Sequence, residues 1–261
     1  MKSFIATALA GALALAGAAQ AQVYGFDISN WQPSVNFAAA YSSGARFVII
    51  KVCLSLSPVS PFSLTQIKPP KNTHTNTLPF SLSQATEGTT YKDPRFSQHY
   101  IGATNAGFIR GGYHFAHPDG SATAQADYFL ANGGGWSADG ITLPGMLDLE
   151  SVSGKAQCYG LSQAAMVSWI RAFSDRYYSR TGRYVMIYTN RSWWTACTGN
   201  SNAFASTNPL VLAAWSSTPG TIPGGWATYT IWQYNDAYGY GGDSDVFNGN
   251  MDRLRVLARG S

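Results

Sequence analysis

The chain has 261 residues and a net charge of +4, with 11% charged and 14% aromatic residues. About 240 residues after removal of a leader are enough for one large domain with a single core. A charge this weak, without a Lys/Arg cluster, argues against a nucleic-acid-binding protein. The many Trp and Tyr residues suit a groove that stacks on sugar rings, or equally an ordinary packed core.

Residues 1–21 have the pattern of a secretory signal peptide. A basic start at Met1-Lys2 precedes an apolar stretch from Phe4 to Ala18 and the small residues of Ala19-Gln20-Ala21. This stretch is short for a membrane span, which needs about 20 residues, and no later segment is long and apolar enough. We therefore expect cleavage after Ala21 and a secreted, extracellular catalytic domain over 22–261, with no membrane partner.

Short strands alternate with helices along most of the chain. Predicted strands cover 24–28, 47–51, 111–115, 143–150, 184–189, 210–215 and 230–234, and predicted helices cover 35–42, 94–106, 123–130 and 162–180. The last helix has the clearest apolar period of three to four residues. This alternation predicts a single α/β domain built on a parallel sheet or barrel.

Residues 52–84 interrupt this pattern. They are rich in Ser, Pro and Thr and have no helical or strand periodicity, and such long structureless loops are rare inside compact domains. Val52-Cys53 can be encoded GTATGT and Gln84 can be encoded CAG, which resemble the two ends of an intron. We therefore hypothesise a retained intron that is translated as a disordered insertion. The alternative is a genuine flexible loop or lid.

The chain has three Cys residues, an odd number for a secreted protein. Cys53 falls in the interrupting segment, so we expect a disulfide between Cys158 and Cys197. Asn190-Arg191-Ser192 is a glycosylation sequon.

Asp148 and Glu150 stand at the end of the apolar run from Ile141 to Leu149. Residues i and i+2 of a strand point to the same side, and two carboxylates so placed repel, which raises the pKa of one of them. Glycoside hydrolysis needs one protonated acid and one ionised carboxylate. The alternatives are a strand end that runs into solvent, or a pair held by Arg or Lys.

The other predicted strands also end in polar or aromatic residues. These are Asp27, Lys51, His114, Tyr188, Trp215 and Gln233. The carboxyl ends of parallel strands in a barrel meet on one face, where active sites lie. The set therefore predicts a catalytic cup.

Several short motifs occur in a specific order. They are Tyr24-Gly25-Phe26-Asp27-Ile28-Ser29, Ile50-Lys51 joined to Ala85-Thr86-Glu87-Gly88, Gly112-Tyr113-His114-Phe115, Leu147-Asp148-Leu149-Glu150, Ile187-Tyr188-Thr189-Asn190, Ala214-Trp215 and Ile231-Trp232-Gln233-Tyr234. This series resembles the glycoside hydrolase family 25 lysozymes, the Chalaropsis type of N-acetylmuramidase. The resemblance implies a modified, partly flattened β/α barrel of the TIM-like kind, with fewer helices than a full eightfold barrel.

The resemblance also implies retaining hydrolysis of the β-1,4 bond between N-acetylmuramic acid and N-acetylglucosamine in bacterial peptidoglycan. It implies no metal or organic cofactor. By matching motifs, Glu150 is the general acid and base, Asp148 assists it, and Asp27 and Asp245 complete the catalytic set, with Asp243 less favoured than Asp245. The residues expected to bind substrate are Tyr113, Tyr188, Trp215, Trp232 and Gln233. Each of them could instead pack in the core. A monomer is expected.

Two competing functions belong to other classes. A family 18 chitinase also ends its motif in Asp-x-Glu, but it would carry acids at the preceding alternate positions, where this chain has Met146 and Pro144. A non-catalytic carbohydrate-binding module could share the fold, but the presence of both Asp148 and Glu150 argues against that reading.

Overall fold

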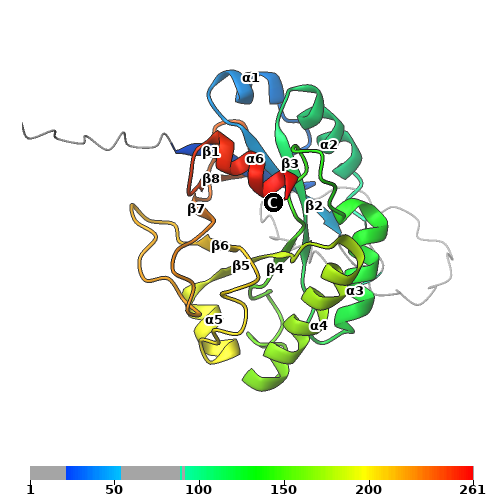
Figure 1. The fold of residues 1–261 in the computed structure, drawn as a ribbon, viewed down its shortest axis with the longest axis vertical. Helices are drawn as coiled ribbons and strands as arrows, with labels where there is room; N and C mark the ends of the chain where they lie inside the picture. The colour runs from blue at the N-terminus through cyan, green and yellow to red at the C-terminus, as the bar shows by residue number, and fades with distance from the viewer. Residues whose placement is uncertain (1–21, 54–88, 90–91, 261) are drawn as a thin grey trace, which may run out of the picture.

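The computed structural model describes residues 22–53, 89 and 92–260, in which eight strands form one closed barrel in chain order (Figure 1). The strands are β1 Val23–Ile28, β2 Phe47–Cys53, β3 Ile109–Phe115, β4 Met146–Asp148, β5 Met186–Asn190, β6 Leu210–Ala213, β7 Ile231–Asn235 and β8 Asp243–Phe247. The expected signal peptide at 1–21 lies outside the described residues, as does segment 54–84 of the expected insertion.

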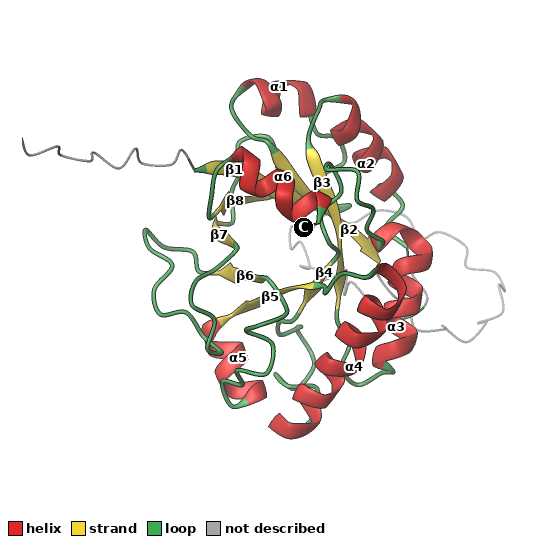
Figure 2. Ribbon diagram, in the orientation of Figure 1, coloured by secondary structure: helices red, strands yellow, loops and turns green. Residues whose placement is uncertain are grey.

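The helices lie outside the barrel, mostly along β1 to β5, whereas loops join β6, β7 and β8 (Figure 2). They are α1 Phe37–Ser42, α2 Phe96–Asn105, α3 Ala122–Phe129 with the short π-helical turn η1 Leu130–Gly134, α4 Gln163–Thr181, α5 Arg191–Thr198 and α6 Met251–Arg259. The side chains of Ser162 and Asn190 cap α4 and α5 by accepting backbone N–H bonds. None of the helices in the described ranges has the length and apolarity that a bilayer crossing requires.

Alternation along the strands produces two apolar layers. Side chains on the outer face of the sheet, such as Phe26, Ile50 and Leu147, pack against the helices in one large cluster. Side chains on the inner face, such as Ile49, Met186 and Val211, fill the barrel in a second cluster. The barrel interior is therefore a packed core, and the residues at the open end of the barrel lie above it.

The last strand runs against the expected direction. β1 to β7 are parallel neighbours, but β8 is antiparallel to both β7 and β1. The structure therefore confirms the expected barrel, and its last strand departs from the parallel direction of the others. The sequence analysis also missed β8, α5 and α6. Two of the inward positions of β8 are Asp243 and Asp245, so this strand lacks the apolar alternation by which a strand is recognised.

Two strand boundaries differ from the prediction. β4 begins at Met146 and not at 143, because Pro144 has no N–H to donate to a ladder. β2 continues through Val52 and Cys53, and Val52 is fully buried. The Val52 carbonyl accepts a hydrogen bond from Asp93 N at 2.9 Å. The chain therefore leaves β2 and returns to it at nearly the same place.

The Cys158–Cys197 disulfide is confirmed, with a sequence separation of 39. It joins the loop that follows β4 to helix α5, on the side of the barrel where β5 ends. The loop after the Asp148–Glu150 pair and the first helix after β5 are therefore covalently linked.

Helix α6 closes the end of the barrel at which the parallel strands begin. Leu254 and Ala258 of α6 belong to the inner cluster, together with Val23 and Ile109, the first residues of β1 and β3. Figure 1 shows α6 lying across this end of the barrel. The carboxyl ends of β1 to β7 form the opposite end.

Candidate active site

Polar inward-facing side chains gather where the parallel strands end. We call this set the acidic cup: Asp27 on β1, Tyr113 on β3, Asp148 on β4, Glu150 just after β4, Tyr188 on β5, Gln233 on β7 and Asp243 at the start of β8. Asp243 reaches this end because β8 is reversed, so its first residue pairs with Asp27.

Gln233 is the hydrogen-bonding centre of the cup. Its Nε2 donates to Asp27 Oδ2 at 2.7 Å and to Asp243 Oδ2 at 3.1 Å. Its Oε1 accepts from Tyr188 Oη and from Trp215 Nε1, both at 2.9 Å. Both amide donors and both acceptor positions are thus used. This one side chain joins two acids to two aromatic residues.

Asp148 and Glu150 face the same cup. Asp148 is 6% exposed and ends β4. Both carboxylates contribute, after burial, to raising the pKa values of Tyr113 and Tyr188 well above 10. Although β4 ends before Glu150, the Leu149 N–H still bonds to the Tyr188 carbonyl. The strand-like pairing with β5 therefore continues one residue past β4, toward Glu150.

Asp27 and Asp243 stand directly opposite each other on β1 and β8. Burial raises the pKa of Asp27 to about 8, and the charges of Asp243 and Glu150 add to this effect, while the Gln233 hydrogen bond and Lys51 oppose it. Burial and then Asp236 raise the pKa of Asp243 to about 6. At neutral pH the cup therefore holds a protonated Asp27 beside an ionised Asp243.

Asp245, which the sequence analysis favoured over Asp243, lies one layer deeper. It pairs with Gly25 and Gln233, is 1% exposed, and has no hydrogen-bond partner on either carboxylate oxygen within the described chain. Burial, with Asp27 and Asp243, raises its pKa well above 3.8. The structure brings Asp243 to Gln233. The sequence could not rank the two acids without the direction of β8.

Three of the four expected aromatic residues belong to this site. Tyr113 and Tyr188 are buried in its wall, and Trp215 is 60% exposed at its rim. Trp232 instead alternates with Gln233 on β7 and faces outward, where its Nε1 donates to the Ala214 carbonyl and its ring contacts Tyr229 and Tyr234. The prediction that Trp232 lines the groove with the other three does not fit this orientation.

Lys51 is a cationic member of the site. Its side chain is buried on the inner face of β2, with Nζ 5.6 Å from the Tyr113 ring centroid and 5.0 Å from that of Phe115. It lowers the pKa of Asp27, against the larger effect of burial. Paired acids with different protonation states, beside an exposed aromatic ring, are what glycosidic bond cleavage requires.

Comparison with known proteins agrees with this geometry. The family model described as glycosyl hydrolases family 25 matches residues 71–243. The chain belongs to glycoside hydrolase family 25. This membership confirms the family expected from the motifs, and with it the assignment as a glycoside hydrolase.

Family 25 proteins of known sequence and structure resemble the chain over nearly its whole length. An N,O-diacetylmuramidase of Arthroderma benhamiae is 56% identical over 258 residues, covering 97% of this chain and 96% of the relative. One of Chalaropsis sp is 58% identical over 243 residues, covering 91% and 100%. The muramidase structure from Trichobolus zukalii has a TM-score of 0.78 at 58% identity, covering 92% and 100%. The likeness confirms the single barrel-like fold.

Proposed function

We infer that this family 25 glycoside hydrolase is a lysozyme that cleaves the β-1,4 bond between N-acetylmuramic acid and N-acetylglucosamine in bacterial peptidoglycan. Its relatives named N,O-diacetylmuramidase support this inference, as does a relative named Lysozyme M1 from Streptomyces globisporus at 44% identity. The observation that carries the proposal is the convergence of Asp148, Glu150 and Asp27 at one end of the barrel. We further propose that the protein is secreted, on the basis of residues 1–21, and acts as a monomer.

Glu150 is the proton donor in this proposal. It protonates the leaving glycosidic oxygen while the N-acetyl oxygen of the substrate, or Asp148, attacks the anomeric carbon. In the second step Glu150 takes a proton from the water that displaces this group, and the two displacements together retain the configuration at the sugar. Asp148, which is buried at the end of β4, is the assisting carboxylate beside it. It stabilises the positive charge that develops on the sugar ring, or orients the N-acetyl group of the substrate for attack.

Asp27, Asp243 and Asp245 support the pair. A protonated Asp27 removes one negative charge from the vicinity of Asp148 and Glu150, which limits repulsion among the acids. Asp243 shares the Gln233 amide with Asp27 and completes the polar wall. Asp245 lies buried beneath them, where its carboxyl interacts electrostatically with Asp27 and Asp243.

Trp215 provides the exposed aromatic face for a sugar ring. Its indole N–H is fixed by Gln233, so the ring is held at the rim of the cup and its orientation depends on the polar network. Tyr113 and Tyr188 line the wall behind it. A sugar stacked on Trp215 therefore lies next to the acids.

The test is clearing of bacterial cell walls by wild type, Glu150→Gln and Asp252→Asn. Removing a general acid lowers the rate by about 10²–10⁴-fold, so Glu150→Gln should lose nearly all clearing. Asp252 has an 85% exposed side chain on α6 and serves as the matched carboxylate control. Equal clearing by wild type and Glu150→Gln would remove Glu150 from its role. Activity on chitin without activity on cell walls would favour a different glycosidase.

A further inference from the structure

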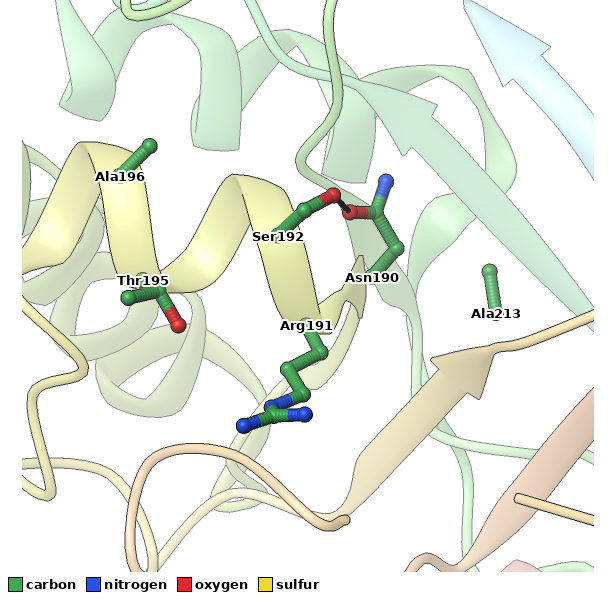
Figure 3. Close-up of a pocket in the computed structure, with 6 residues that line it drawn as sticks. All are labelled: Asn190, Arg191, Ser192, Thr195, Ala196 and Ala213. Atoms are coloured by element: carbon green, nitrogen blue, oxygen red, sulfur yellow. Dashed lines mark hydrogen bonds between the residues drawn. The ribbon is translucent and has the colours of Figure 1, made fainter. Parts of the chain in front are cut away.

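A pocket with a volume of about 610 Å³ opens beside the acidic cup, where β5 and β6 end. We call it the Arg191 pocket; it is lined by Asn190, Arg191, Ser192, Thr195, Ala196 and Ala213 (Figure 3). We propose that it binds a carboxylate carried by the muramyl residue of a glycan strand seated in the cup. This inference rests on the proposed lysozyme function.

The pocket and the cup share a wall. Asn190 of β5 pairs with Ala213 of β6, and Ala213 pairs with Gln233 of β7. Neighbouring strands lie about 4.8 Å apart, so the pocket begins one strand spacing from Gln233, at Ala213, and Asn190 lies two spacings away. Tyr188 precedes Asn190 by two residues on β5 and donates to Gln233. A substituent on a sugar at the cup can therefore reach the pocket.

Arg191 is the charged residue of the pocket lining. It is exposed, and the ion pairs between described residues do not involve it. Figure 3 shows its side chain projecting from the first turn of α5. A guanidinium presents a planar fork of donors that matches a carboxylate in two parallel hydrogen bonds.

Two polar groups of the pocket, Asn190 Oδ1 and Ser192 Oγ, already have structural roles. Asn190 Oδ1 accepts hydrogen bonds from Trp193 N at 2.9 Å and from Ser192 Oγ at 2.6 Å, so the first turn of α5 is capped internally. Among the lining residues Arg191 alone carries a positive charge, so an anion in the pocket would pair with its guanidinium.

The charge distribution favours one orientation of an anionic sugar. The cup carries several acids, which repel a carboxylate, whereas Arg191 attracts it. N-Acetylmuramic acid differs from N-acetylglucosamine by a lactyl ether, whose carboxyl is either free or extended by a stem peptide that carries its own carboxylates. N-Acetylglucosamine has no such charge. The pocket would thus place the muramyl residue, and not its neighbour, on the β5–β6 side of the cup.

The experiment compares wild type with Arg191→Gln on three soluble glycan substrates. The first carries stem peptides with free carboxylates, the second is the same material with its carboxylates converted to amides, and the third has been stripped of peptides and exposes lactyl carboxylates. Arg180→Gln, at an exposed position on α4, controls for the loss of one positive charge. The proteins are produced without N-glycans because Asn190 begins a sequon in the pocket.

We expect Arg191→Gln to raise KM about fivefold on a carboxylate-bearing substrate and to leave kcat nearly unchanged, as fits one solvent-accessible ion pair. The amidated substrate should show no difference between the two proteins. Arg191→Lys should recover part of the affinity, and Arg180→Gln should match wild type. A loss on the peptide-bearing strands alone identifies the peptide as the source of the carboxylate, and a loss on the stripped strands identifies the lactyl group.

The inference is overturned if Arg191→Gln and wild type have the same KM on both carboxylate-bearing substrates. It is also overturned if Arg191→Gln raises KM on the amidated substrate by as much as on the carboxylate-bearing ones. Both of these outcomes require active wild-type enzyme. Failure of the lysozyme proposal would appear differently, as wild-type protein that cleaves none of the three substrates.

Discussion

Asp27 is a partly buried acid whose charged neighbours include the acids Asp243 and Glu150. Its pKa of about 8 means that the native state keeps a proton that the unfolded state, with an Asp pKa near 3.9, releases at lower pH. Because the pKa of this acid is higher in the native state than in the unfolded state, the free energy of unfolding decreases progressively as pH rises from about 4 to about 8. Below that window the native and unfolded states are protonated alike.

Asp27→Asn should therefore stabilise the protein at the upper end of this window. Asn cannot ionise, and its carbonyl can still accept the hydrogen bond from Gln233 Nε2. Relative to wild type, Tm should rise at pH 8 by more than the about 2–4 °C that 1 kcal/mol corresponds to, with little change at pH 4. Thermal unfolding across this pH range measures the effect.

Asp252→Asn again provides the control, because its exposed carboxylate should leave the pH dependence of Tm unchanged. A stability gain for Asp27→Asn that is the same at pH 4 and pH 8 would contradict the raised pKa of Asp27.

Strand ends indicated several residues of the site, but not how they connect. Asp27, Tyr188 and Gln233 were recognisable because each ends a predicted strand, and parallel strand ends meet on one face. The choice between Asp243 and Asp245 depended on the direction of β8, which the sequence does not encode locally. The outward position of Trp232 likewise follows from the register of β7, which a motif does not reveal.

At the scale of elements, the disulfide fixes two segments beside the cup. Cys158 lies in the loop that follows Glu150, and Cys197 lies on α5, which carries Arg191. Cross-linking residues 39 apart restricts the unfolded chain and in the chain-entropy account stabilises the fold by about 2–4 kcal/mol.

Replacing both Cys158 and Cys197 by Ser should lower Tm by about 5–10 °C. A reducing agent should lower the Tm of wild type by a similar amount and leave the double variant unaffected. Differential scanning calorimetry with and without reductant tests this. An identical Tm for oxidised wild type and the double variant would show that the bridge contributes nothing to stability.

Element boundaries were predicted well where periodicity is long and poorly where it is short. Helix α4 was expected at 162–180 and observed at Gln163–Thr181, because its apolar stripe repeats over many turns. Helix α5 is much shorter and follows β5 with no intervening loop, so its sequence gives few turns from which a period can be read. Pro144 was the local signal for the later start of β4.

At the scale of the molecule, the barrel holds close together the described residues that precede and follow the segment between Cys53 and Lys92. Val52 O and Asp93 N are hydrogen-bonded, so the ends of that segment are already held together by β2 and the start of the α2 region. When the ends of a loop are already held together, shortening the loop changes only the entropic cost of closing it, which falls.

Deleting residues 54–84, which keeps β2 whole and joins Cys53 to Ala85, should leave the barrel folded. We expect the free energy of unfolding to rise by about 1–2 kcal/mol from the shorter loop, with cell-wall clearing at least equal to that of the full chain. Thermal unfolding and the clearing assay on both proteins provide the measurement. Failure of the shortened chain to fold would mean that the segment supplies contacts that the barrel needs.

Helix α6 has a practical consequence. It seals the end of the barrel where the parallel strands start, and its last residue, Arg259, is therefore at the far side of the molecule from the acids. An affinity tag, a fluorescent label or a solid support attached through this terminus would face away from the polysaccharide. Enzyme immobilised in this way should present the acidic cup to an insoluble fragment of cell wall.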